Sequence, residues 1–195
     1  MLTTAKTAVR GSLCAVLMAV AQVSPAAAEA AVWRIDPGAS AITITFDVDN
    51  APRQGVFETF RGEARFDPAA LEEADLRFEI ETASIDLDEP FATDFVKSID
   101  WLFVEEHPTA VYDLQRLERI AGDRFRAIGL LTLRGRTHQV AGELTLALGA
   151  DDASAAGQAG FDRKDFNVGV GFSTLFVEIG PRIGVSFDLK ATRVE

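Results

Sequence analysis

Residues 124–148 read RFRAIGLLTLRGRTHQVAGELTLAL and alternate between two kinds of side chain. One set is apolar or small and recurs at every second position: Phe125, Ala127, Gly129, Leu131 and Leu133, then Val140, Gly142, Leu144, Leu146 and Leu148. Successive side chains of a strand point to opposite faces, so this pattern predicts two strands with one dry and one wet face. Between them, Leu133-Arg134-Gly135-Arg136-Thr137 predicts a tight hairpin turn.

The same period of two extends outward in both directions along the chain. It recurs in residues 42–48, 62–66, 76–80 and 183–189, and turn residues such as Asp36-Pro37-Gly38 and Gly180-Pro181 separate the runs. Residues 149–160 are small and polar, and we expect a flexible loop there. About eight strands result, which favours an all-β fold: an eight-stranded antiparallel barrel that closes on itself.

One segment departs from this alternation. Around residues 89–106, Phe91, Phe95, Ile99 and Leu102 follow a spacing closer to a helical stripe. We expect a short helical excursion between strands that covers one end of the barrel.

The N-terminus has the features of a secretory signal peptide. Lys6 and Arg10 precede an apolar run over residues 13–23, and Ala26-Ala27-Ala28 offers a cleavage site. The run is shorter than the ~20 residues that span a bilayer. We expect residues 1–28 to be a signal peptide cleaved after about Ala28, with one periplasmic domain over residues 29–195. The single cysteine, Cys14, lies within the removed segment.

Charge and residue types exclude several classes of function. The chain has 30 acidic and 19 basic residues, which disfavours nucleic-acid binding because phosphate contacts need clustered Lys and Arg. There are two histidines, His107 and His138, and no Gly-x-Ser-x-Gly motif. The sequence therefore predicts neither a catalytic constellation nor a metal site, and the protein is expected not to be an enzyme.

Aromatic composition points to a dry interior. The chain has fourteen phenylalanines, two tryptophans and one tyrosine. Phenylalanine carries no group that needs a hydrogen bond, so it suits surfaces shielded from water. Two interpretations remain open at this level: an ordinary packed core, or the wall of a lipid pocket.

Several motifs, taken in order, resemble those of the YceI-like family of secreted, lipocalin-like barrels. They are Trp33-Arg34-Ile35-Asp36-Pro37 with Ser40, Gly55-Val56-Phe57, Phe66-Asp67-Pro68, Ser84-Ile85-Asp86, Lys97-Ser98-Ile99-Asp100-Trp101-Leu102, His107-Pro108, Leu131-Thr132-Leu133-Arg134-Gly135 and Asp165-Phe166-Asn167. The resemblance implies an eight-stranded barrel that binds a polyisoprenoid, such as a quinone side chain or an isoprenyl phosphate. It implies no metal, cofactor or catalytic residue, and it suggests a b-type membrane cytochrome as a partner.

Candidate ligand-binding residues follow from the inward-facing positions and the excursion. They are Phe46, Phe57, Phe60, Phe78, Ile80, Val185 and Phe187 for the wall, Phe91, Phe95, Trp101 and Leu102 for a lid, and Phe166 near the end of the chain. Arg163 and Asp165 are candidates for holding a headgroup at the barrel mouth, since Arg is well matched to phosphate or carbonyl oxygen.

Two functions remain open for such a barrel. The first is a periplasmic carrier that holds a polyisoprenoid lipid in an apolar interior. The alternative is an accessory module with a packed interior that docks on a b-type membrane cytochrome or serves in stress response. Interior volume separates the two: a continuous void of several hundred Å3 favours the carrier. Exposed barrel strands also leave a homodimer open.

Overall fold

The computed structural model describes residues 30–172 and 175–194, so the expected signal peptide lies outside the described part of the chain. The helix and strand bounds are β1 (Ala31–Ile35), β2 (Ala41–Val48), β3 (Ala51–Phe57), β4 (Phe60–Phe66), β5 (Asp75–Glu81), β6 (Ile85–Asp86), α1 (Pro90–Lys97), β7 (Thr109–Ala121), β8 (Arg124–Leu133), β9 (Arg136–Leu148), β10 (Asp152–Asp162) and β11 (Arg182–Val194).

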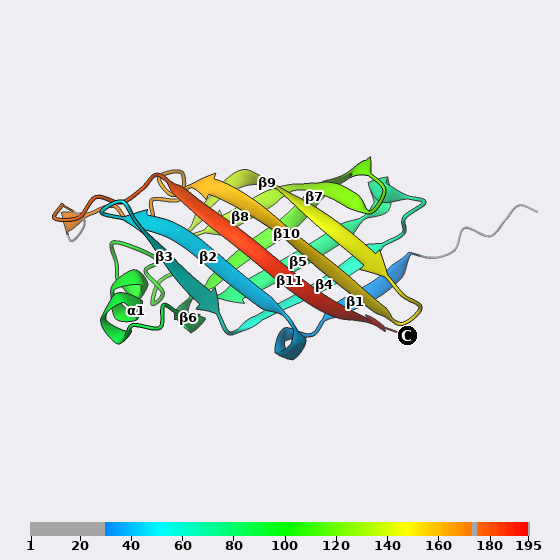
Figure 1. Cartoon of the computed structure of the whole chain (residues 1–195), viewed down its shortest axis with the longest axis horizontal. Coiled ribbons are helices and arrows are strands. Elements are labelled where there is room, and N and C mark those ends of the chain that lie inside the picture. The colour runs from blue at the N-terminus through cyan, green and yellow to red at the C-terminus, as the bar shows by residue number, and fades with distance from the viewer. Residues whose placement is uncertain (1–29, 173–174, 195) are drawn as a thin grey trace, which may run out of the picture.

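These strands occupy eight positions around one closed antiparallel barrel (Figure 1). Three of these positions are each filled by two strands. β1 and β2 share one position, since both pair with β11. β3 and β4 share the next, since they pair with β2 and β1 respectively, and β5 and β6 share a third, since they pair with β4 and β3. The β1–β11 pairing closes the sheet and leaves β1 without a free edge. The predicted eight-stranded all-β barrel is confirmed.

The hairpin between β8 and β9 forms at the predicted place. Thr132 pairs with Thr137 and Leu133 with Arg136, which leaves Arg134 and Gly135 as the two turn residues. Both have positive φ, 51° and 68°. This is the backbone that a two-residue turn needs to match the twist of its strands.

The expectation of a flexible loop at residues 149–160 is wrong, because strand β10 occupies most of this range. The strand pairs with β9 and β11 over most of its length. From Ala153 to Ala159 its inward side chains are small, so its apolar alternation is weak in sequence. Gly157 leaves room for a neighbour, since a Cβ there would lie 2.8 Å from the ring of Phe187.

The excursion between β6 and β7 is helical over a shorter range than predicted. Helix α1 begins at Pro90, where a missing N–H costs nothing, and ends at Lys97, with Ser98 as its C-cap. Residues 98–108 continue as turns. Within the described residues, no helix combines the length and the hydropathy needed to cross a bilayer.

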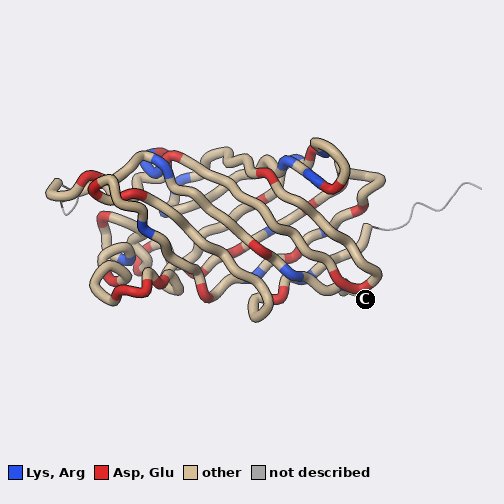
Figure 2. Tube along the Cα trace, viewed as in Figure 1, with Lys and Arg blue, Asp and Glu red and all other residues tan. Residues whose placement is uncertain are grey.

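Outward positions carry the charges. Arg77 on β5 pairs with Asp113 on β7 at 2.8 Å, and Glu143 on β9 accepts from Arg124 and Arg126 on β8, each at 3.1 Å. Figure 2 shows basic and acidic residues distributed along the strands of the barrel. Exposed ion pairs of this kind add little to the stability of the fold, but their charges keep the outer face of the sheet hydrated.

Candidate ligand-binding site

A cavity of about 310 Å3 runs through the barrel interior, lined by side chains from all eight barrel positions. Among the wall residues are Ile35, Ile44, Phe57, Leu76, Phe78, Ile80, Leu131, Leu144, Leu146, Phe161, Val185, Phe187 and Leu189. Charged lining is confined to Arg65 and Asp75, exposed residues that face each other across the β4–β5 pair. The volume falls at the lower end of the ~300–1,000 Å3 typical of ligand pockets.

Small inward residues keep this space open. Ala64, Ala127, Gly142, Ala155 and Ala159 all line the cavity, and they come from β4, β8, β9 and β10. A barrel of eight strands is just wide enough for ordinary side chains to fill it. The void therefore exists because these positions carry side chains too short to meet in the middle.

Six of the residues expected to contact a ligand line this cavity. They are Phe57, Phe78, Ile80, Leu102, Val185 and Phe187. Phe60 does not line the cavity: it is buried and stacks on Phe78 with ring centroids 5.5 Å apart.

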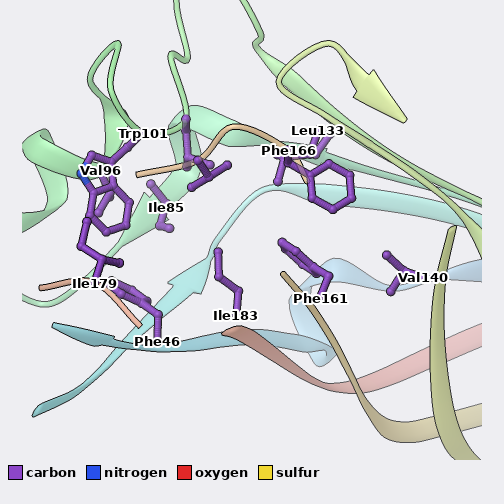
Figure 3. Close-up of a cluster of buried hydrophobic side chains, with 13 residues drawn as sticks. Phe46, Ile85, Val96, Trp101, Leu133, Val140, Phe161, Phe166, Ile179 and Ile183 are labelled. Carbon is purple, nitrogen blue, oxygen red and sulfur yellow. The ribbon is translucent and has the colours of Figure 1, made fainter. Parts of the chain in front are cut away.

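At the α1 end of the barrel, bulky side chains pack against one another (Figure 3). We call Phe46, Trp101, Phe161, Phe166 and Ile179 the end plug. Trp101 lies 5.5 Å from Phe46, and Phe166 lies 4.9 Å from Phe161, as ring centroids. Phe166 has no exposed surface. Phe46, Trp101 and Phe166 therefore close the barrel end instead of lining the cavity.

The expected lid is only partly built as predicted. Leu102 reaches the cavity, but Phe95 packs on the outer side of the plug, 5.9 Å from Trp101. Phe91, on the solvent side of α1, is 79 % exposed. Neither Phe91 nor Phe95 lines the cavity, because the helix turns one face outward.

Arg163 is buried at the same end and holds a loop together. Its guanidinium donates four of its five N–H groups to backbone carbonyls: Gly180 at 2.8 Å, Val168 at 3.0 Å, Gly169 at 2.6 Å and Ile179 at 3.1 Å. Burial lowers the pKa of Arg163 from its ordinary value. Asp165 is exposed on the outer side of this loop. Neither candidate headgroup residue lines the cavity, because Arg163 is committed to the backbone.

Tyr112, which sequence reasoning did not single out, is the aromatic hydroxyl of the cavity wall. It pairs in register with Phe78 and Leu131, and a side chain at Gly129 would begin 2.7 Å from its hydroxyl oxygen. We find no hydrogen-bond partner for this hydroxyl among the described residues. Burial raises the pKa of Tyr112 to about 12. Its position could have identified it from the sequence, because the one tyrosine of the chain falls at an inward-facing position.

Two other features carry less weight as sites. A shallow hollow of about 500 Å3 on the outer face of β8–β11, lined by Arg126, Gln139 and Arg182 among others, opens directly to solvent. The described residues contain no group of three or more His, Cys, Asp or Glu side chains placed to hold a metal ion. The apolar cavity inside the barrel is the candidate site.

The model of the YceI-like domain matches residues 33–191, nearly the whole described chain. The chain belongs to the YceI-like domain family. Its first motif has a structural role: Trp33 and Ile35 lie on the cavity wall, Asp36 accepts a 2.9 Å hydrogen bond from the backbone N–H of Gly38, and Ser40 donates to the Asp36 carbonyl at 2.6 Å.

Relatives in the YceI-like family include two proteins called UPF0312. One, from Azotobacter vinelandii, is 28 % identical over 132 residues, 66 % of this chain and 69 % of its own length. The other, from Vibrio cholerae, is 25 % identical over 177 residues, 86 % of this chain and 94 % of its own.

Solved structures share the barrel. BcnA of Burkholderia cenocepacia superposes with a TM-score of 0.74 and 25 % identity, covering 81 % of this chain and 99 % of its own. A polyisoprenoid-binding domain from Saccharophagus degradans superposes with a TM-score of 0.67 at 14 % identity, covering 83 % and 98 %. The YceI-like fold predicted from the sequence motifs is confirmed.

Proposed function

We propose that this protein is a periplasmic carrier that holds a polyisoprenoid lipid in its barrel cavity. The observation that carries the proposal is the continuous apolar void of about 310 Å3 between the eight barrel positions. A barrel with a filled interior would instead suit an accessory module, and the void disfavours that alternative. A structural neighbour is described as a polyisoprenoid-binding domain, which supports the same ligand class.

The physical driving force is removal of apolar surface from water. Each buried CH2 group contributes ~0.8 kcal/mol, so a branched hydrocarbon tail gains affinity with every carbon enclosed. The cavity wall has few polar groups that would have to be desolvated when a hydrocarbon tail binds. Binding by this means needs no reacting group, and the protein acts by holding its ligand and not by converting it.

Tyr112 gives the cavity one polar contact. With a pKa of about 12, its hydroxyl stays protonated at neutral pH and donates a hydrogen bond to an oxygen of the ligand. No positively charged side chain lies beside it in register, since its pairing partners are Phe78 and Leu131. A phosphate would be buried there without a counter-charge, so the wall at Tyr112 favours a neutral oxygen such as a quinone carbonyl.

Extraction and identification of the lipid that co-purifies tests this proposal. We expect one neutral prenyl lipid per chain, and we expect the emptied protein to rebind a quinone of matching tail length with a change in tryptophan fluorescence, because Trp33 lines the cavity. A protein that stays empty after exposure to polyprenyl quinones and phosphates alike would overturn the proposal.

A further inference from the structure

Three large apolar side chains stand exposed on the loop between β10 and β11. Phe172 is 75 %, Leu175 71 % and Phe176 79 % exposed, and the two rings contact each other edge to face at 5.8 Å. We call these three residues the apolar tip. In Figure 1 the orange segment that carries them projects beyond the barrel end. Single exposed apolar residues are common, but a projecting group of this kind marks an interaction site.

The apolar tip belongs to the same end of the molecule as α1. The backbone N–H of Val170, just before the tip, donates to the carbonyl of Asp100 at 3.0 Å. Two further exposed apolar residues belong to α1 and the turn after it: Phe91 is 79 % exposed and Ile99 is 61 % exposed. At the opposite end, where β7 finishes, Ile120 is 43 % exposed. Exposed aromatic surface is therefore gathered at one end of the barrel.

We propose that the apolar tip inserts into a lipid bilayer, with the barrel remaining outside it. A specific protein–protein interface takes ~800 Å2 from each partner, and three side chains that are about three-quarters exposed offer roughly half of that. The tip is also convex. Insertion between lipid headgroups needs only a few bulky apolar side chains, because each gains from leaving water on its own.

Charge selects the kind of bilayer. The described residues of the tip include no Lys or Arg, and Glu178 is exposed two residues after Phe176; the exposed acids Glu89 and Glu105 and the exposed bases Arg136 and Lys164 lie at the same end. Binding to anionic lipid normally depends on a cluster of basic residues near the surface, and this end carries acids and bases side by side without such a cluster. The favoured surface is zwitterionic, and its binding is insensitive to salt because it does not depend on charge attraction.

This inference rests on the proposed carrier function for its purpose, because a polyisoprenoid that does not dissolve in water has to be collected from a membrane. Docking through the apolar tip brings the end plug, and Leu102 of the cavity wall behind it, close to the bilayer surface. The barrel axis then meets the membrane at its α1 end.

Flotation of the purified full chain with phosphatidylcholine vesicles tests the inference. We expect the wild-type chain to float with the vesicles at both low and high salt. Phe176→Ser should reduce the bound fraction several-fold, and the double variant Phe172→Ser/Phe176→Ser at least about tenfold. Ile120→Ser, an exposed apolar residue at the other end, is the matched control and should float like wild type.

Circular dichroism of each variant checks that the barrel is folded, which we expect because the substituted side chains are exposed. Equal flotation of wild type and the double variant, or no flotation of wild type, would overturn the inference. A concentration-dependent dimer abolished by Phe176→Ser would also overturn it, in favour of a protein partner. Loading with quinone from detergent micelles is measured in parallel and separates this failure from that of the carrier function, since the double variant should still load.

Discussion

The two halves of the barrel interior are filled in opposite ways, although the same strands run through both. At the α1 end, the ring of Phe46 packs on Trp101 and the ring of Phe166 packs on Phe161, within one buried cluster. Further along the same strands, Ala127, Ala155 and their neighbours leave a cavity of about 310 Å3. The comparison shows that bulky aromatic residues close this barrel and small residues open it, so phenylalanine content by itself does not predict a pocket.

The largest expected effect comes from removing one ring in each half. Phe166→Ala should lower the free energy of unfolding by about 3–5 kcal/mol, because it opens a new void in the plug where no surface is exposed. Phe187→Ala, on the cavity wall, should cost clearly less, since its ring already borders empty space. Urea unfolding of the two variants measures both values. Equal losses would mean that the two halves are packed alike.

A second prediction concerns the loop that closes the plug. Arg163→Leu leaves four backbone carbonyls without their donor, and we expect a loss of about 2–4 kcal/mol of stability. Thermal unfolding measures this loss. A variant with unchanged stability but weakened lipid binding would contradict the structural role and restore Arg163 as a headgroup residue.

Filling the open half tests the cavity itself. Ala155→Leu places a larger side chain into the void, and we expect quinone loading to fall about tenfold or more while stability changes by less than ~1.5 kcal/mol. Ala156→Leu, one residue along β10 and exposed on the outer face, is the control and should load normally. Fluorescence titration compares them. Normal loading of Ala155→Leu would place the lipid elsewhere.

The smallest expected effect is at Tyr112. Tyr112→Phe removes one hydroxyl, and quinone binding should weaken about fivefold, while binding of squalene, a prenyl hydrocarbon without oxygen, should not change. Carbon-13 labelling of the tyrosine Cζ gives a single signal, because the chain has one tyrosine. That signal should shift on loading with quinone and much less with squalene. Identical shifts would exclude the hydrogen bond.

Tyr112 also predicts a dependence of stability on pH. Burial raises its pKa from 10.0 to about 12, so the unfolded chain loses this proton at lower pH than the folded protein does. The stabilisation is complete below pH 10 and is lost as the pH rises toward 12. Unfolding at pH 9 and pH 11 should therefore show a smaller drop for Tyr112→Phe than for wild type. An equal drop would mean that the hydroxyl is not buried.

The alternation of apolar and polar side chains was sufficient to predict the fold, because a repeat of two residues indicates which side chains point inward. It predicted the β8–β9 hairpin, the eight-stranded barrel and the inward positions of four cavity-lining residues, Phe78, Ile80, Val185 and Phe187. Strand β10 was missed since alanine and glycine at its inward positions give little contrast with its outward residues. The same small residues leave the cavity open. The strand with the least apolar contrast in sequence therefore contributes directly to the candidate site.

Other features depend on distances that a repeat pattern does not contain. Inward-facing rings either meet or leave a gap, and that depends on the barrel width at each level; Phe46 and Phe78 look alike in sequence but lie in different halves. Arg163 has a charged side chain that sequence reasoning assigned to a ligand, and its real partners are carbonyls 5 to 17 residues away. Loop paths determine such partners.

Native mass spectrometry of the purified chain, exposed to a polyprenyl quinone and then freed of excess lipid, tests the central claim most directly. The hollow half of the barrel predicts a folded protein whose mass rises by one lipid per chain, with the increase lost in Ala155→Leu and kept in Ala156→Leu. A wild-type mass that remains that of the bare polypeptide would contradict it.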